Sequence, residues 1–157
     1  MIDLEEARTR AAACGFPLCA DGVIETDRWW FIPVLQIGSF GVVVDKADGR
    51  CTCLGSVGRL EDWLWAYDAG LLDPGELVVT HVSDPARARE LLRTAGFSVT
   101  TADLQTLPLR RSAETSWMRL AELRALAPEI ARWHVEGPRG VRGPFAHPQP
   151  VLPLEPT

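Results

Sequence analysis

The residues of this 157-residue chain that could do chemistry are four cysteines, three histidines and several pairs of carboxylates. Cys51 and Cys53 are two apart on a predicted strand and share a face, while four residues separate Cys14 from Cys19. Diagnostic zinc sites use two C-x(2–4)-C pairs, so this spacing favours free thiols, and we expect no metal. The histidines lie far apart in the sequence, at His81, His134 and His147.

No catalytic motif accompanies these residues. The chain has no metalloprotease, nucleophile-elbow, phosphate-loop or dinucleotide-binding pattern. Gly38 and Gly41 flank Ser39, but the spacing is that of a turn. We therefore expect no cofactor, and an enzyme is the least favoured class.

Two pairs of acidic residues give a different kind of candidate. Asp45 and Asp48 flank a predicted hairpin turn, while Glu61 and Asp62 begin a predicted helix. Both pairs fit a structural role, because aspartate favours turns and carboxylates interact well with a helix N-terminus. The functional alternative is an acidic recognition patch.

Six tryptophans make a binding function the more informative alternative. Trp63 lies on the apolar stripe of its predicted helix, whereas Trp65 lies off that stripe among carboxylates. Tryptophans beside charged residues often anchor interfaces, because they bury a large area with few rotatable bonds. A second packing layer is the competing explanation for Trp65. The predicted partner-binding residues are Trp65, Glu61, Asp62, Asp68, Trp29, Trp30, Asp45 and Asp48.

The charge distribution narrows the class of partner. The net charge is −5; residues 1–79 carry 13 acidic and 6 basic side chains, which gives −7, and residues 80–157 carry 8 and 10, which gives +2. An acidic chain repels nucleic-acid phosphate, so we expect no nucleic-acid partner. A negative surface instead steers a basic protein partner.

Length and hydrophobicity indicate an ordinary globular domain. The chain can bury a core without disulfides or metal. No segment approaches the roughly 20 apolar residues that span a bilayer, and the acidic N-terminus lacks the basic region of a secretory signal. We therefore expect no membrane association and a cytoplasmic location.

The elements that must position these residues alternate between helices and strands. We expect a helix over 3–14 with Asp3 as its cap, strands at 22–26, 29–35, 41–45 and 50–54, and a helix over 59–71. Trp29 and Trp30 then face opposite sides of their strand. A strand at 76–82, a helix that Asp84 and Pro85 begin, and a strand at 97–101 form a compact unit.

The C-terminal part is expected to be helical and then irregular. Ser112 is the predicted cap of a helix that Pro128 breaks, and a final helical turn carries Ile130 and Trp133. Six prolines and three glycines fill the last 21 residues. The predicted fold is therefore α+β: a small, mainly antiparallel sheet with helices packed on it, plus a C-terminal strand–helix–strand unit and helix. One domain covers residues 1–136, and 137–157 form an irregular tail.

Residues 1–71 resemble the YrhB-like immunity family of bacterial toxin loci. The resemblance rests on the aromatic strand Trp29-Trp30-Phe31, the strand Val42–Asp45, the Asp48-Gly49 turn and the helix with Glu61-Asp62-Trp63-Leu64. Such a resemblance implies a small α+β protein that neutralises a cognate toxin and has no catalytic residues. Residues 76–157 depart from the pattern.

Two functions follow as hypotheses. The first is an immunity-type protein that occludes the active site of a toxin with a basic cleft. The second is a small-molecule-sensing regulatory domain, based on the strand–helix–strand unit at 76–101.

Overall fold

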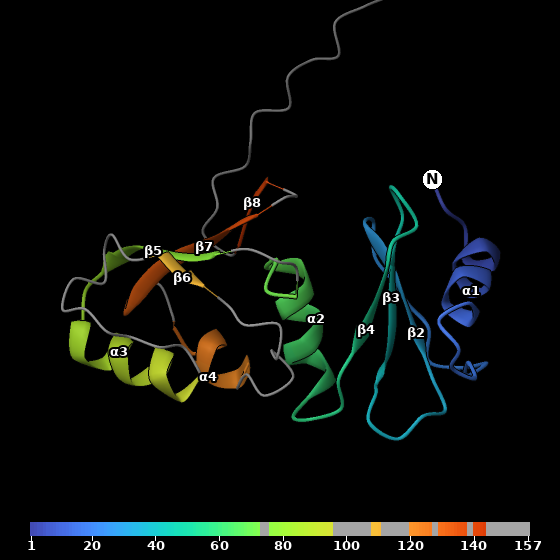
Figure 1. The fold of residues 1–157 in the computed structure, drawn as a ribbon, viewed down its shortest axis with the longest axis horizontal. Coiled ribbons are helices and arrows are strands. Elements are labelled where there is room, and N and C mark those ends of the chain that lie inside the picture. The colour runs from blue at the N-terminus through green and yellow to red at the C-terminus, as the bar shows by residue number, and fades with distance from the viewer. Residues whose placement is uncertain (73–75, 96–107, 111–119, 127–128, 138–139, 144–157) are drawn as a thin grey trace, which may run out of the picture. The chain divides into compact units, whose positions relative to one another are not determined.

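The chain begins with a capped helix and continues into an antiparallel sheet (Figure 1). A computed structural model describes residues 1–72, 76–95, 108–110, 120–126, 129–137 and 140–143. The chain divides into two compact units, the first built mainly from Met1–Trp65 and the second mainly from the residues that follow.

Helix α1 (Leu4–Ala12) forms where the sequence predicts it. Asp3 is the N-cap, and its carboxylate accepts a hydrogen bond from the backbone N–H of Glu6 at 2.8 Å. Ala7 and Ala11 are fully buried, because their side of the helix packs on the sheet. The predicted cap of this helix is therefore confirmed.

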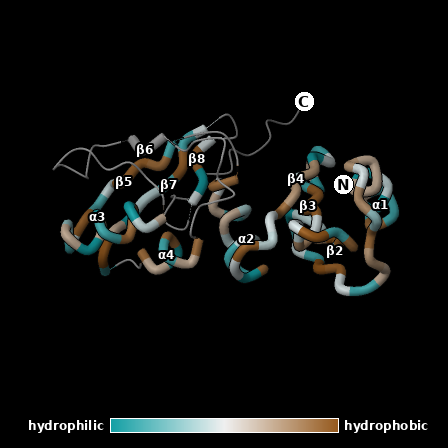
Figure 2. The backbone as a smooth tube through the Cα atoms, turned by 60° about the horizontal axis from the view of Figure 1, so that its bottom comes forward, coloured by the Kyte–Doolittle hydropathy of each residue, from teal (hydrophilic) through white to brown (hydrophobic). Residues whose placement is uncertain are grey.

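The sheet of unit 1 has the order β1-β2-β3-β4, with antiparallel neighbours throughout. Its strands are β1 (Ile24–Glu25), β2 (Trp29–Pro33), β3 (Gly41–Asp45) and β4 (Cys51–Leu54). Figure 2 shows hydrophobic residues along β2 and β3, the two inner strands. Val42, Val43 and Val44 are all fully buried, so β3 is covered on both faces.

The register assigns the side chains of this sheet to two faces. One face carries Ile32, Val42 and Val44, which pack with Ala7 and Ala11 of α1. The other face carries Trp29, Phe31 and Val43, which are buried as well. Helix α1 therefore covers only the first of the two faces.

Helix α2 (Leu60–Asp68) follows β4 after a short loop. Trp63 is buried, and its indole N–H donates to the carbonyl oxygen of Val57 at 2.8 Å, which ties the loop to the helix. Tyr67 is buried too, as the predicted stripe requires. The helix ends at Asp68, earlier than the predicted residue 71, and Gly70 follows at φ +79°.

Unit 2 contains a second antiparallel sheet, with the order β6-β5-β7-β8. The strands are β5 (Glu76–Val82), β6 (Pro108–Arg110), β7 (Ala131–Gly137) and β8 (Gly140–Arg142). Helix α3 (Pro85–Thr94) begins as predicted, since the Asp84 carboxylate accepts from the Arg87 N–H at 3.2 Å. Helix α4 (Leu120–Arg124) precedes β7.

The predicted helical turn with Ile130 and Trp133 is wrong. The residues around Trp133 form β7 and not a helical turn, because Ala131, Trp133 and Val135 are buried at a period of two while β7 pairs with β5. Regular structure also continues past residue 137, since β8 pairs with β7. The predicted strand at 97–101 and the predicted helix start at Ser112 lie outside the described residues.

The fold class is α+β, as predicted, with helices and two open antiparallel sheets. The predicted boundaries of 1–136 for one domain and 137–157 for a tail stay predictions. Over the ranges that the structure describes, no helix has the length and the apolar character needed to cross a bilayer.

Candidate functional site

The first predicted surface, the outward side of α2, is less open than its sequence indicates. Glu61 is exposed and pairs with Arg59 at 3.2 Å, but Asp62 is only 9% exposed. Trp65 and Asp68 are half-buried. This helix face therefore presents one exposed carboxylate, which is already paired with Arg59, and its tryptophan shows only part of its surface.

The second predicted surface is the turn between β3 and β4, which holds Asp45 and Asp48. Asp45 is half-buried, and its carboxylate accepts a hydrogen bond from the Ala47 N–H at 2.9 Å. Asp48 is exposed, and its carboxylate accepts from the Arg50 N–H, also at 2.9 Å. Both contacts are turn-forming bonds of the kind aspartate favours. They hold two carboxylates in fixed positions at one end of the sheet.

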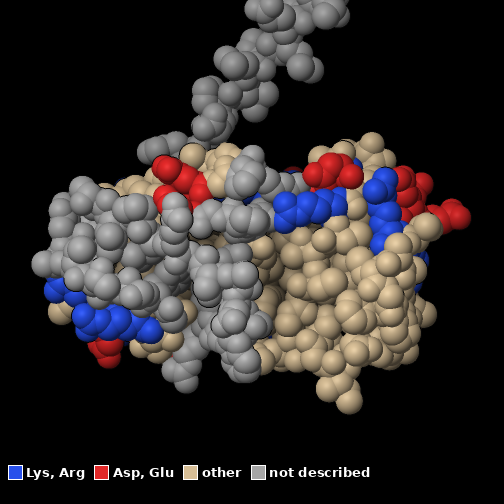
Figure 3. Space-filling model, in the orientation of Figure 1, with Lys and Arg blue, Asp and Glu red and all other residues tan. Residues whose placement is uncertain are grey.

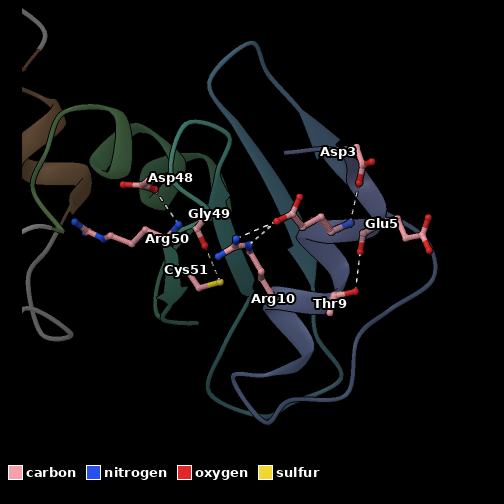
Figure 4. A network of polar contacts seen from close by, with 9 residues as sticks. Asp3, Glu5, Thr9, Arg10, Asp48, Gly49, Arg50 and Cys51 are labelled. Atoms are coloured by element: carbon pink, nitrogen blue, oxygen red, sulfur yellow. Dashed lines mark hydrogen bonds and ion pairs between the residues drawn. The ribbon is translucent and has the colours of Figure 1, made fainter. Parts of the chain in front are cut away.

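Gly49 completes this turn and allows α1 to approach it. Its φ of +74° is a conformation that glycine adopts without strain. A Cβ at Gly49 would lie only 2.5 Å from the guanidinium carbon of Arg10, so the Arg10 side chain packs directly on the glycine (Figure 4). Arg10 is held in place by Glu6, whose carboxylate accepts from it at 2.9 Å.

Lys46 lies in the same turn and is buried, with 8% of its side chain exposed. Its ammonium group pairs with the Glu25 carboxylate at 2.7 Å and lies 4.5 Å from the centre of a Trp30 ring. A cation this close to an indole face is attracted by the ring quadrupole. The Trp30 indole N–H in turn donates to the carbonyl oxygen of Ile2 at 3.0 Å, which fixes the ring and the N-terminal segment.

A cavity of about 430 Å³ opens beside this turn. Its volume falls in the range of small-ligand pockets, about 300–1,000 Å³. Four of the six lining residues carry a charge, although most of the lining surface is apolar: Met1, Asp27, Arg28, Asp45, Lys46 and Ala47. All six residues belong to unit 1. Figure 3 shows charged side chains gathered at this end of the unit.

The structure therefore brings together part of the predicted set. Trp30, Asp45 and Asp48 lie at one end of the first sheet, around Lys46 and the cavity. Trp29 is paired with Asp45 across β2 and β3, but it is only 4% exposed and belongs to the core. The two tryptophans face opposite sides, as predicted, and the more accessible one is Trp30.

Sequence reasoning missed two groups of residues. The first group reaches the site from β1 and the β1–β2 turn and consists of Glu25, Asp27 and Arg28. The one feature of the sequence that could have pointed to this group is that Lys46 is the single lysine of the chain. The other group is apolar and exposed at the opposite end of the same sheet: Leu35 (69%), Ile37 (101%) and Val57 (70%). They lie in the loops that follow β2 and β4, which leave the same end of an antiparallel sheet.

Among the described residues, the remaining candidates for chemistry form no metal centre. All four cysteines are free thiols within residues 1–72. His134 pairs with Glu136 at 2.8 Å on β7. Over the described ranges, no three His, Cys, Asp or Glu side chains are placed so as to hold a metal ion. The prediction that the protein needs no metal stays a prediction.

Comparison with known proteins found no match among protein-family models, curated proteins or solved structures.

Proposed function

We propose that this chain is an immunity-type protein that binds a cognate bacterial toxin and neutralises it by occluding the toxin's active site. The observation that carries this proposal is the fixed acidic turn of the β3–β4 hairpin. Asp48 is exposed there, and Asp45 lines the adjoining cavity. Carboxylates held by the backbone of their own turn lose little conformational entropy on binding, which favours affinity.

The net charge of the N-terminal half also favours a toxin with a basic cleft. Residues 1–79 carry a net charge of −7, so the part of the sequence that contains the turn repels anions and attracts cationic surfaces. A toxin that acts on a nucleic acid, a nucleotide or another anionic substrate has a basic cleft. The acidic turn would enter that cleft and exclude the substrate by charge and by volume.

The element order of unit 1 is compatible with the proposal. A helix and four antiparallel strands, followed by the first residues of α2, give a small α+β unit, as the resemblance to the YrhB-like immunity family implies. The residues that carry the resemblance lie in β2, in β3, in the turn and in α2. The turn and Trp30 are the preferred contact surface, and the side of α2 with Glu61 and Trp65 is the second.

A defined toxin is needed to test this function. The open reading frame next to the gene supplies the candidate, which would be expressed with and without the protein. Survival of cells that express both, together with a stable complex of the purified proteins, is the expected result. Toxicity that persists at equal expression, with no complex in size-exclusion chromatography, would reject the proposal.

The contact surface is tested by matched charge variants. Asp48→Asn keeps the acceptor for the Arg50 N–H and removes the charge, so the turn should survive. We expect about a tenfold weaker affinity for the toxin, or about 1.4 kcal/mol, and a smaller dependence of association on salt. Glu90→Gln removes an exposed charge from α3 and should bind like the wild type. Equal affinities for both variants would move the contact surface away from the turn.

A further inference from the structure

Three of the four thiols converge where α1 meets β4. Cys51 and Cys53 are two apart on β4, opposite Val44 and Val42, so both point to the face that α1 covers. Cys14 follows the end of α1, and its N–H donates to the carbonyl oxygen of Ala11 at 3.0 Å. Ala11 belongs to the buried cluster against which Cys51 packs, so the turn that holds Cys14 begins beside the face that carries the strand thiols.

The electrostatics of the thiols agree with this geometry. Besides burial, Cys14 raises the pKa of both Cys51 and Cys53, as a thiol beside the two strand residues does, and its own Sγ donates to the carbonyl oxygen of Arg10 at 3.8 Å. Cys14 and Cys53 are exposed and Cys51 is half-buried, so a small reagent can reach the group from solvent. The fourth thiol, Cys19, contributes to neither pKa shift and follows Leu18, which forms a bridge with Val34.

We propose that Cys14 forms a reversible disulfide with Cys51 or Cys53, so that the end of α1 and strand β4 make a thiol–disulfide switch that responds to low-molecular-weight disulfides. This proposal goes beyond toxin binding and needs no partner protein. The two thiols of β4 are alternatives, because both face Cys14 from one side of the strand.

The reaction is thiol–disulfide exchange in two steps. The Cys14 thiolate attacks one sulfur of the small disulfide, whose S–S bond breaks and releases one thiol that takes up a proton. The Cys51 or Cys53 thiolate then attacks the Cys14 sulfur of the mixed disulfide and releases the second small thiol. The protein loses two electrons and two protons, and the small disulfide is reduced to two thiols.

Local structure decides which thiol reacts first. Burial and the neighbouring Cys14 raise the pKa of Cys51 to about 11, and burial also raises the pKa of Cys53. Because their pKa values are raised, few of the strand thiols are ionised at neutral pH, so they react slowly as nucleophiles. The same lack of stabilisation of their thiolates favours the disulfide once it has formed. Arg10 opposes the shift at Cys51. The exposed Cys14 is therefore the entry point, and the strand thiols resolve the intermediate.

Peptide mapping of the full chain tests the proposal. The protein is treated with glutathione disulfide, alkylated and cleaved with trypsin, which yields peptides 11–28 and 51–59. We expect the two peptides to be joined, with a loss of roughly 2 Da from the pair, and dithiothreitol to separate them. The oxidised protein should also melt at least about 5 °C higher, because the bond closes a loop between residues 14 and 51 or 53.

Serine variants identify the sulfurs. Cys14→Ser and the double change Cys51→Ser with Cys53→Ser should each abolish the link, while Cys19→Ser and either single strand variant should keep it. Reduced wild type and Cys14→Ser should melt alike, which shows that the loss of the link is not a loss of fold. A link that persists in Cys14→Ser would assign the bond to Cys19 and overturn the proposal. Peptides that stay separate at every oxidant concentration, or a bond within 51–59, would overturn it too.

Discussion

At the residue scale, the unusual group is the single lysine. Lys46 is buried between the Trp30 ring and the Glu25 carboxylate, while its backbone N–H donates to Arg28 and its carbonyl accepts from Ile2. The residue therefore connects β1, β2, the hairpin turn and the N-terminal segment. A buried ammonium group is costly to desolvate, and its two partners here offset that cost.

Removing this charge should destabilise unit 1. Lys46→Met keeps an apolar stem but loses the ion pair and the cation–π contact, so we expect the free energy of unfolding to fall by about 1 kcal/mol. Lys46→Arg retains the charge and should lose less. Urea unfolding of both variants measures the difference. Equal stabilities for Lys46→Met and the wild type would mean that the ammonium group contributes nothing net.

The Cys51 thiol should make stability depend on pH in the alkaline range. Its pKa is raised from the ordinary 9.0 to about 11, first by burial and then by Cys14. Between these values the folded chain retains a proton that the unfolded chain releases, so stability falls as pH rises and is unaffected by this group below pH 9. Denaturant unfolding of the reduced wild type and of Cys51→Ser from about pH 8 to 11 checks this sign. The wild-type advantage should shrink with pH, and a constant difference would contradict it.

At the element scale, the first half of the chain follows its local signals. Asp3 caps α1, Asp48 and Gly49 turn the hairpin, and Trp63 and Tyr67 are buried on α2. Each of these features depends on neighbours within a few residues. The strand around Trp133 was missed because its alternation is short and its pairing partner β5 is some 50 residues away in the sequence. The nearby Pro128 instead indicated a break in a helix, and a final helical turn was therefore predicted after it.

Only part of the candidate site could be predicted from local sequence signals. Asp45 and Asp48 could be placed at a turn because the Asp-Gly signal is local. The meeting of Glu25, Lys46 and Trp30 could not be predicted, since it depends on the register between three strands. Burial of Asp62 and of Trp29 is likewise a property of the packed unit and has no local signal.

The start of β3 requires a glycine for reasons of space. A Cβ at Gly41 would lie 2.4 Å from the carbonyl oxygen of Ile32 and 2.7 Å from the Phe31 ring. Gly41→Ala should therefore destabilise the protein by about 2 kcal/mol or more, as overpacking does. Gly38→Ala is the matched control, because its φ is +95° but a Cβ there meets nothing within 4 Å. It should cost about 1 kcal/mol from backbone strain alone. Thermal melts that rank the two variants in the opposite order would show that the sheet relaxes around Gly41.

At the scale of the whole molecule, the two antiparallel sheets belong to parts of the sequence that differ in net charge. The acidic half of the sequence contains the first sheet, while the second sheet belongs to unit 2 and, apart from the start of β5, lies in the half with a slight positive excess. Antiparallel pairing joins β5 to β7 across a long stretch of sequence, so the integrity of unit 2 depends on the C-terminal part of the chain. The last 21 residues of that part are rich in proline and glycine, a composition typical of irregular segments.

Two truncations test how much the residues from 137 onward contribute to stability. β8 pairs with β7 at Val135 with Arg142 and at Glu136 with Val141, and the Arg142 guanidinium lies 5.7 Å from the centre of the Tyr67 ring. Deletion of residues 137–157 removes this strand and its cation–π contact, so we expect the melting temperature to fall by about 5 °C or more. Deletion of 144–157 keeps β8, and we expect little change.

The difference between the two truncations measures the contribution of residues 137–143 alone. Arg142→Ala in the full-length chain removes only the guanidinium over Tyr67. It should therefore lower the melting temperature by only part of this difference. The rest comes from the hydrogen-bonded ladder between β7 and β8, which also shields the edge of β7 from solvent. If both truncations melt with the full-length protein, β8 adds nothing to unit 2. If deletion of 144–157 alone reproduces the loss, the stabilising contacts belong to the last fourteen residues instead.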